Sequence, residues 1–348
     1  MSAALSNRSV CITPKALRTK RRSPSLASLM NLKTNLAFGI VSDQTCSKIK
    51  KAINLIIDTA SPKKYRLSPT SPEFTFDVNF ITLTLPSTQV HSDTVIKHDC
   101  MNPFLVAWRG RDKDLRYVWR AEKQANGNIH FHILSNSFYH YKNLREDWNR
   151  IIERLGYVDA YANNFVGMSK KSYIAKFKGS NDSQAILSER WELGESVGWR
   201  QPNSTDVHAI GSVNDVAAYV AKYAAKQSAG IRFKDKEFVP SKVIDRNKVK
   251  LTIAEIVAIR ASCNIVEGKI WGCDRLTGRF KSTVFSEFDN EFSKVMDIVV
   301  SAATYVCVKE FITVYYGNFH KLFMSITSEV LSGYQLAVSE YLLPPILT

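Results

Sequence analysis

The sequence predicts an α+β fold, because strand-like and helix-like segments alternate through the first two thirds of its 348 residues. FDVNFITLTLP (residues 76–86) alternates apolar and polar side chains and ends at a proline, as strands do. Residues 115–123 and 129–134 are two further strand-like runs. Residues 47–58 and 144–156 carry the periodicity of helices that could pack on a sheet.

The N-terminal region is strongly basic. The whole chain has a formal net charge of +15, which predicts a polyanionic partner. Residues 1–66 contain 13 Lys and Arg but only two acidic residues, Asp43 and Asp58. RTKRRSPSLAS within residues 1–40 predicts a disordered basic arm, which either contacts DNA phosphates or is simply solvated.

Residues 41–73 are predicted to form an amphipathic helix and a linker. SKIKKAINLIID places Ile49, Ile53 and Ile56 on one helical face and lysines on the other. The Pro- and Ser-rich stretch that follows ends the helix, and residues 157–205 show no clear pattern.

The cysteines and the apolar stretches suggest a compartment. Six scattered cysteines without a C-x-x-C motif are typical of a reducing environment, and the N-terminus lacks the apolar run of a signal peptide. The apolar stretch Ile298–Val308 is too short to cross a bilayer as a helix, so we expect a buried helix or strand and no membrane partner.

Two histidines lie two residues apart in NIHFHIL. On a strand, His130 and His132 share one face, while Ile129, Phe131 and Ile133 share the other face, which packs in the core. The pair indicates either a polar outer face or two ligands for one divalent ion, Mg²⁺, Mn²⁺ or equally Zn²⁺.

Glu122 on the preceding strand favours the metal site. It lies opposite His130 if the loop has three residues, Ala125–Gly127, with Gly127 in the left-handed conformation of a bulge. The plain two-residue turn at Asn126–Gly127 would bury Glu122 beside Phe131, which is unfavourable. We therefore predict that Glu122, His130 and His132 bind one ion and leave coordination positions open.

A second motif lies in SVNDVAAYVAKYAAK (residues 212–226), where Ser212 and Asp215 are spaced like a capping box. Tyr219 and Tyr223 stack on one face of this predicted helix, and a lysine, Lys222 or Lys226, follows each tyrosine by three residues. A phenol needs a nearby positive charge or a metal to act as a nucleophile. The alternative is an amphipathic helix with tyrosines at the margin of the core.

FITLTLP (80–86), HFH (130–132) and YVAKYAAK (219–226) occur in the order of the three motifs of rolling-circle replication initiators, the HUH endonucleases, which this chain resembles over residues 74–230. Two tyrosines resemble the initiators of single-stranded DNA phages and some plasmids, although a two-tyrosine transposase stays open.

The resemblance implies a central antiparallel sheet flanked by helices in residues 74–235. It also implies origin- and strand-specific nicking of DNA, with Tyr219 and Tyr223 as nucleophiles, Lys222 and Lys226 beside them, and Mg²⁺ or Mn²⁺ as the cofactor. A tyrosine joined to the 5′ phosphate would free a 3′-OH primer and later rejoin the ends.

No G-x-x-x-x-G-K-[ST] motif occurs, so no helicase of that type is fused. This favours a phage or plasmid protein in the cytoplasm of a bacterial host, or in the host nucleus for a eukaryotic virus, with a host helicase and polymerase as partners. Residues 236–348 are predicted to be mainly helical, and EGKIWGCDRL (267–276) has no predicted role.

Two other classes of protein remain open from the sequence. A non-catalytic nucleic-acid-binding protein would need only the basic arm and the aromatic residues. A basic-armed capsid or packaging protein would rest on residues 1–66 alone. Cleavage of a single-stranded oligonucleotide in Mg²⁺ or Mn²⁺ separates both from an endonuclease.

Overall fold

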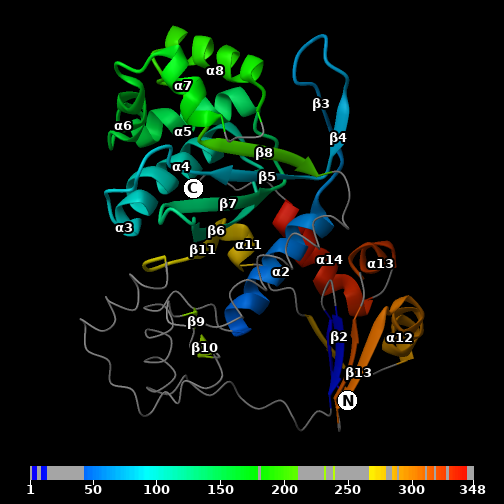
Figure 1. Cartoon of the computed structure of the whole chain (residues 1–348). Helices are drawn as coiled ribbons and strands as arrows, with labels where there is room; N and C mark the ends of the chain where they lie inside the picture. The colour runs from blue at the N-terminus through cyan, green and yellow to red at the C-terminus, as the bar shows by residue number, and fades with distance from the viewer. Residues whose placement is uncertain are drawn as a thin grey trace.

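A computed structural model gives the arrangement of the chain (Figure 1). It describes residues 2–5, 9–13, 43–178, 182–210, 231–232, 238–239, 266–279, 284–287, 290–309, 312–316, 319–326 and 329–342. These residues form an α+β structure in which helices flank an antiparallel five-stranded sheet, as predicted.

The main sheet has the strand order β11-β6-β7-β5-β8, and every neighbouring pair is antiparallel. Its strands are β5 (Val78–Leu83), β6 (Tyr117–Lys123), β7 (Ile129–Ser135), β8 (Thr205–Ile210) and β11 (Trp271–Cys273). The predicted strand 76–86 is divided, because β4 (Phe74–Phe76) leaves the sheet to pair with β3 (Lys63–Tyr65).

The β6–β7 hairpin has the predicted three-residue loop. The amide of Gln124 donates to the carbonyl of Asn128 (2.8 Å), and the amide of Gly127 donates to the carbonyl of Gln124 (2.9 Å). Gly127 has φ 85°, which favours glycine at this position. Because Ala125–Gly127 form the loop, Glu122 pairs with His130, as the burial of Phe131 requires.

One face of the sheet is buried under helices. Ile129, Phe131 and Ile133 are fully buried there, and Phe131 contacts Trp148 at a ring-centroid distance of 6.3 Å. The helices near this face include α5, which carries Trp148, and α4, which packs on α5. Their bounds are α3 Asp93–Ile96, the π-helix η2 Lys97–Met101, α4 Asn102–Arg111 and α5 Tyr141–Glu153.

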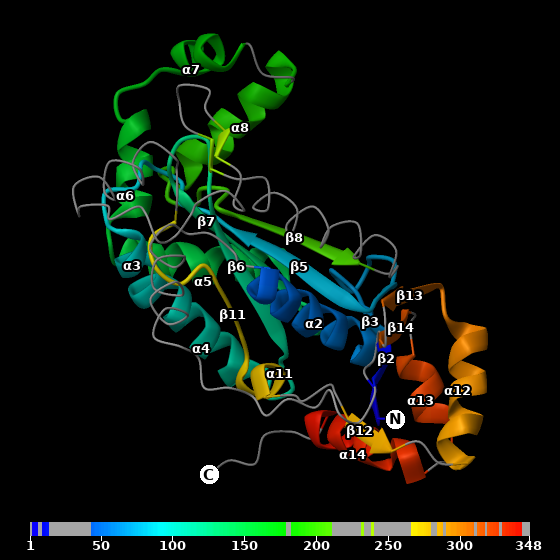
Figure 2. The same ribbon diagram turned by 90° about the horizontal axis from the view of Figure 1, so that it is seen from below.

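The opposite face, which carries the histidines, is also partly covered. Helix α2 (Asp43–Thr59) lies beside β6 (Figure 2), and the predicted apolar stripe of Ile49, Ile53 and Ile56 is buried. These isoleucines share one hydrophobic core with Val118 and Leu134, which point to this face. The helix predicted at residues 47–58 is therefore confirmed, and it forms part of the same folded unit as the sheet.

A helical insertion connects α5 to β8. It consists of α6 (Tyr157–Ala162), the 3₁₀ helix η3 (Asn163–Phe165), α7 (Lys170–Phe177) and α8 (Gln184–Ser196). The predicted helix 144–156 ends earlier, at Glu153, because Gly156 has φ 77° and forms the N-cap of α6. The insertion has its own aromatic core, in which Trp199 stacks on Phe165 at 3.8 Å.

The two ends of the chain build a second sheet, with the order β12-β1-β2-β14-β13. Its strands are β1 (Ser2–Leu5), β2 (Ser9–Thr13), β12 (Val284–Glu287), β13 (Tyr305–Lys309) and β14 (Ile312–Tyr316). The structure differs here from the predicted disordered arm, because residues 2–5 and 9–13 pair as strands. Residues 14–42 lie outside the described part of the chain.

The C-terminal region contains strands as well as the predicted helices. Its helices are α11 (Arg275–Arg279), α12 (Asn290–Ala302), α13 (His320–Ser325) and α14 (Glu329–Leu342), and a short pair, β9 (Ile231–Arg232) and β10 (Phe238–Val239), precedes them. Val299, Phe319, Phe323 and Tyr334 belong to a separate core.

The expectation of a buried helix or strand at Ile298–Val308 was wrong. The stretch is divided between α12 and β13, and it exposes 51% of Val300 and 67% of Val308. No helix among the described residues is long and apolar enough to span a membrane.

Candidate metal centre

Strand register brings the three predicted ligands together. Glu122 on β6 pairs directly with His130 on β7, and directly paired residues of antiparallel strands place their side chains on the same face. His132 shares this face because it lies two residues after His130. Three side chains from one hairpin therefore converge without any contribution from distant elements.

The ligand atoms are close enough for one ion. Nε2 of His130 lies 3.2 Å from Nε2 of His132, and Oε2 of Glu122 lies 3.6 Å and 3.7 Å from these two nitrogens. Ligand atoms about 2.1 Å from a shared ion are at most about 4.2 Å apart, and all three separations are shorter. The donor set fits a divalent cation, and two imidazoles with one carboxylate leave positions for substrate oxygens.

The face that carries this cluster is less open than predicted. The side chain of His132 is only 9% exposed and stacks on Phe80, with ring centroids 5.5 Å apart. Burial lowers the pKa of His132, and the neighbouring positive charge of Arg120 acts in the same direction. The imidazole is therefore held in the neutral form that a metal ligand needs.

The carboxyl of Glu122 stays ionised despite its surroundings. Burial alone would raise its pKa, but the adjacent imidazoles of His130 and His132 and the charge of Arg120 hold the pKa well below its usual range. A negatively charged oxygen is the better ligand for a hard cation.

Thr82 supports His132 from the neighbouring strand. It is the direct β5 partner of His132, and its Oγ1 lies 3.1 Å from Nδ1 of the imidazole. If Nε2 is to bind a metal, the proton must be on Nδ1, which then donates to the hydroxyl. This contact explains why a threonine follows the apolar residues in FITLTLP.

Sequence reasoning missed Arg120 as a member of the site. Its Nη2 lies 3.5 Å from Oε1 of Glu122, and its side chain is 8% exposed. Arg120 also pairs with Trp271 on β11 and with His132 on β7, so all three side chains occupy one row on the same face. The i, i+2 spacing from Glu122 was the available signal for Arg120, whereas Trp271 had none, because β11 comes from far along the chain.

The predicted nucleophiles lie outside the described residues. Tyr219, Tyr223, Lys222 and Lys226 belong to residues 211–230, which directly follow β8 in the sequence. The predicted helix 212–226 and the roles of these four residues stay predictions.

Comparison with known proteins gives one match. Residues 78–228 match a family described as replication-associated protein ORF2. This range contains the three ligands of the metal centre and both predicted tyrosines. No curated protein matches the chain, and no solved structure matches it.

Proposed function

We propose that this chain, whose residues 78–228 belong to a family of replication-associated proteins, starts rolling-circle replication by nicking single-stranded DNA at an origin. The nick would leave the protein joined to the 5′ phosphate through a tyrosine and free a 3′-OH for a host polymerase. A host helicase would open the duplex, and the work would take place in the cytoplasm of a bacterial host.

The observation that carries this proposal is the convergence of Glu122, His130 and His132 inside the family match. A replication protein could bind DNA without any such cluster. Three ligand atoms within 4.8 Å of one another, contacted by Thr82 and Arg120, instead favour metal-dependent chemistry on a phosphate.

A divalent ion held by these residues would supply Lewis-acid polarisation of the scissile phosphate. Tyr219 or Tyr223 would provide the attacking oxygen. A new bond forms between this oxygen and phosphorus, the bond from phosphorus to the 3′-oxygen breaks, and the phenol proton ends on the 3′-oxygen. Because the phosphotyrosine retains a phosphodiester, the reverse attack by a 3′-OH rejoins the strand.

Arg120 would contribute a fixed positive charge beside the reacting phosphate. Its side chain is largely buried, so its charge acts through a medium of lower polarity than water. It offsets the charge of Glu122 when no cation is bound, and it would stabilise the additional negative charge of the transition state.

The proposal is tested with single-stranded oligonucleotides that carry the candidate origin. The full chain is incubated with each oligonucleotide in Mg²⁺ or Mn²⁺, and adducts that survive denaturation are separated by electrophoresis. Tyr219→Phe and Tyr223→Phe should each retain some adduct, and the double variant should form none. Tyr305→Phe, at an exposed tyrosine of the second sheet, is the matched control.

Two outcomes would contradict the proposal. Absence of any cleavage or adduct by the wild-type chain in both ions, despite DNA binding, would favour the non-catalytic alternative. An adduct of undiminished yield in the double variant would show that another residue is the nucleophile.

A further inference from the structure

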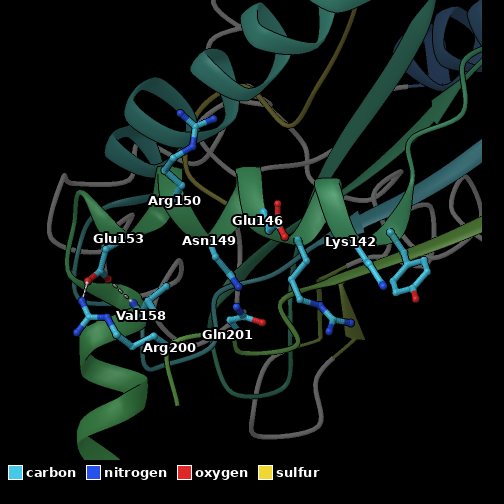
Figure 3. Close-up of a pocket in the computed structure, with 10 residues that line it drawn as sticks. Lys142, Glu146, Asn149, Arg150, Glu153, Val158, Arg200 and Gln201 are labelled. Atoms are coloured by element: carbon cyan, nitrogen blue, oxygen red, sulfur yellow. Dashed lines mark hydrogen bonds and ion pairs between the residues drawn. The ribbon is translucent and has the colours of Figure 1, made fainter. Parts of the chain in front are cut away.

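Two cavities adjoin helix α5 on the side of the sheet away from the metal centre. The first has a volume of about 510 Å³ and lies between α5 and the segment that precedes β8 (Figure 3). Its lining residues on α5 include Lys142, Asn149 and Glu153, and Arg200 and Gln201 come from the segment before β8. Figure 3 shows Asn149 close to Gln201 and the ion pair of Glu153 with Arg200.

The second cavity, of about 370 Å³, follows the edge of β8. Tyr141 and Arg145 line both cavities, so the two spaces meet at these side chains. We call the combined space the α5 groove. It is open to solvent along its length because Tyr141 and Lys142 are exposed.

The groove contains two cations without a carboxylate partner. Arg150 pairs with Asp147, and Arg200 pairs with Glu153, so these charges are offset. In contrast, neither Lys142 nor Arg145 forms an ion pair within the described part of the chain. The groove therefore presents two uncompensated positive charges one helical turn apart.

Arg145 also has an unused hydrogen-bond donor. Its Nη2 donates to Oδ1 of Asn203 (2.7 Å), which fixes the direction of the guanidinium. Its Nε is buried and has no hydrogen-bond partner among the described residues. Since buried donors are rarely left unpaired, this atom indicates an acceptor that the groove binds, and a phosphate oxygen is the acceptor that suits a guanidinium.

Strand register connects the groove to the metal centre. Asp206 lines the second cavity, and its row in the sheet continues through Thr82 to His132. The backbones of β8 and β7 are two strand spacings apart, about 10 Å. The carboxylate of Asp206 is paired with His208 at 2.8 Å, which offsets its repulsion of a passing anion. A polyanion that leaves the metal centre across β5 thus reaches the groove at the edge of β8.

An aromatic ring lies beside the two cations. The side chain of Tyr141 is exposed, and its ring is held near that of His140 at a centroid distance of 4.7 Å. An exposed aromatic ring next to phosphate-binding cations is the combination that binds single-stranded nucleic acid, because each base can stack on the ring.

We propose that the α5 groove binds the single-stranded DNA that flanks the scissile phosphate. Lys142 and Arg145 contact two phosphates, and a base stacks on Tyr141. This assignment deepens the proposed nicking function, because it adds a substrate subsite on the opposite side of the sheet from the metal centre.

The test measures binding of a fluorescent oligothymidine of about 20 nucleotides in EDTA, where no cleavage can occur. Affinity is measured over a range of salt concentrations. Each phosphate contact in single-stranded DNA contributes about 0.7 to the slope of log K against log salt. Lys142→Ala should therefore reduce the slope by about 0.7, and Lys142→Ala with Arg145→Gln by about 1.4.

The control is Lys113→Ala combined with Lys321→Ala, an equal change in charge at two exposed lysines away from the groove. Its slope should stay closer to that of the wild type than the slope of the groove variants. Tyr141→Ala should weaken binding by about 5- to 150-fold, and Tyr141→Phe should restore the affinity, because stacking needs the ring and not the hydroxyl. Thermal unfolding of each variant identifies any loss of folding, and the exposed Lys142→Ala keeps the test informative if the Arg145 variant is unstable.

The outcomes separate the groove from the nicking proposal. If the groove variants bind the oligonucleotide with wild-type affinity and slope, the subsite is refuted, even if the wild-type chain nicks DNA. If binding falls as expected but no adduct ever forms, the subsite stands and the nicking function fails. Groove variants that lose affinity for duplex DNA but keep wild-type affinity for single strands would also overturn the proposal.

Discussion

Replacing Thr82 by valine tests whether the β5 strand orients the metal ligand His132. Valine has nearly the same shape but removes Oγ1, which lies 3.1 Å from Nδ1 of the imidazole. His132 is buried, so its Nδ1–H would lose its partner, at a cost of about 1–3 kcal/mol of folding free energy. Loss of the hydrogen-bond partner of a metal-bound histidine typically lowers metal affinity by about 10- to 100-fold, which corresponds to about 1.4–2.7 kcal/mol.

The assay is titration calorimetry of the full chain with Mn²⁺, which requires no knowledge of the origin sequence. Thr82→Ser keeps the hydroxyl and should bind Mn²⁺ within a few-fold of the wild type. If Thr82→Val binds Mn²⁺ as tightly as the wild type while remaining folded, Thr82 does not position His132. An equal loss in both variants would mean that the packing of the methyl group matters, and not the hydrogen bond.

Three further predictions follow from other contacts. His130→Ala should lower Mn²⁺ affinity at least tenfold with little change in melting temperature, and a wild-type titration curve would exclude His130 as a ligand. Burial raises the pKa of Asp147, but hydrogen bonds from Arg111, Tyr139 and Arg150 overcome this and lower it to about 2. The ionised carboxyl therefore stabilises the fold above pH 4, and this stabilisation is lost as the pH falls towards 2. Tyr139→Phe removes the 2.6 Å bond to Asp147 and should cost about 1.5–3 kcal/mol at pH 7, with a smaller further loss below pH 4, which urea unfolding at several pH values would measure. Gly272→Ala should destabilise the fold by about 1–3 kcal/mol in the same assay, because the new Cβ would lie 2.7 Å from the Trp119 indole nitrogen, and unchanged stability would show that the ring can move.

The register of the metal site could be predicted because local burial decides it. Phe131 and Glu122 cannot both face the core, so only one hairpin loop length satisfies both side chains. Gly127 supplies the conformation that this loop needs. All the information lies within a short run of consecutive residues, and for that reason the ligand set needs no long-range knowledge.

The burial of His132 could not be predicted in the same way. Strand parity shows which side chains share a face, but it does not show what covers that face. Helix α2 lies far earlier in the sequence, and its isoleucine stripe fits any apolar surface equally well. The expectation that both histidines point away from the core therefore holds better for His130 than for His132, and His132→Ala should cost stability as well as metal binding.

The distant pairings had no local signal at all. A three-residue strand such as β11 is too short to show a period of two, and β1 and β2 were hidden in a basic, Ser-rich composition. What fixes β11 beside β6 is steric: Gly272 has no side chain, so the Trp119 indole can lie directly against its backbone. This complementarity exists only once β6 has formed and Trp119 has taken its place on Phe131. The segment 267–276 thus acquires its role, which places Trp271 in the row of Arg120 and His132, from tertiary structure and not from its own sequence.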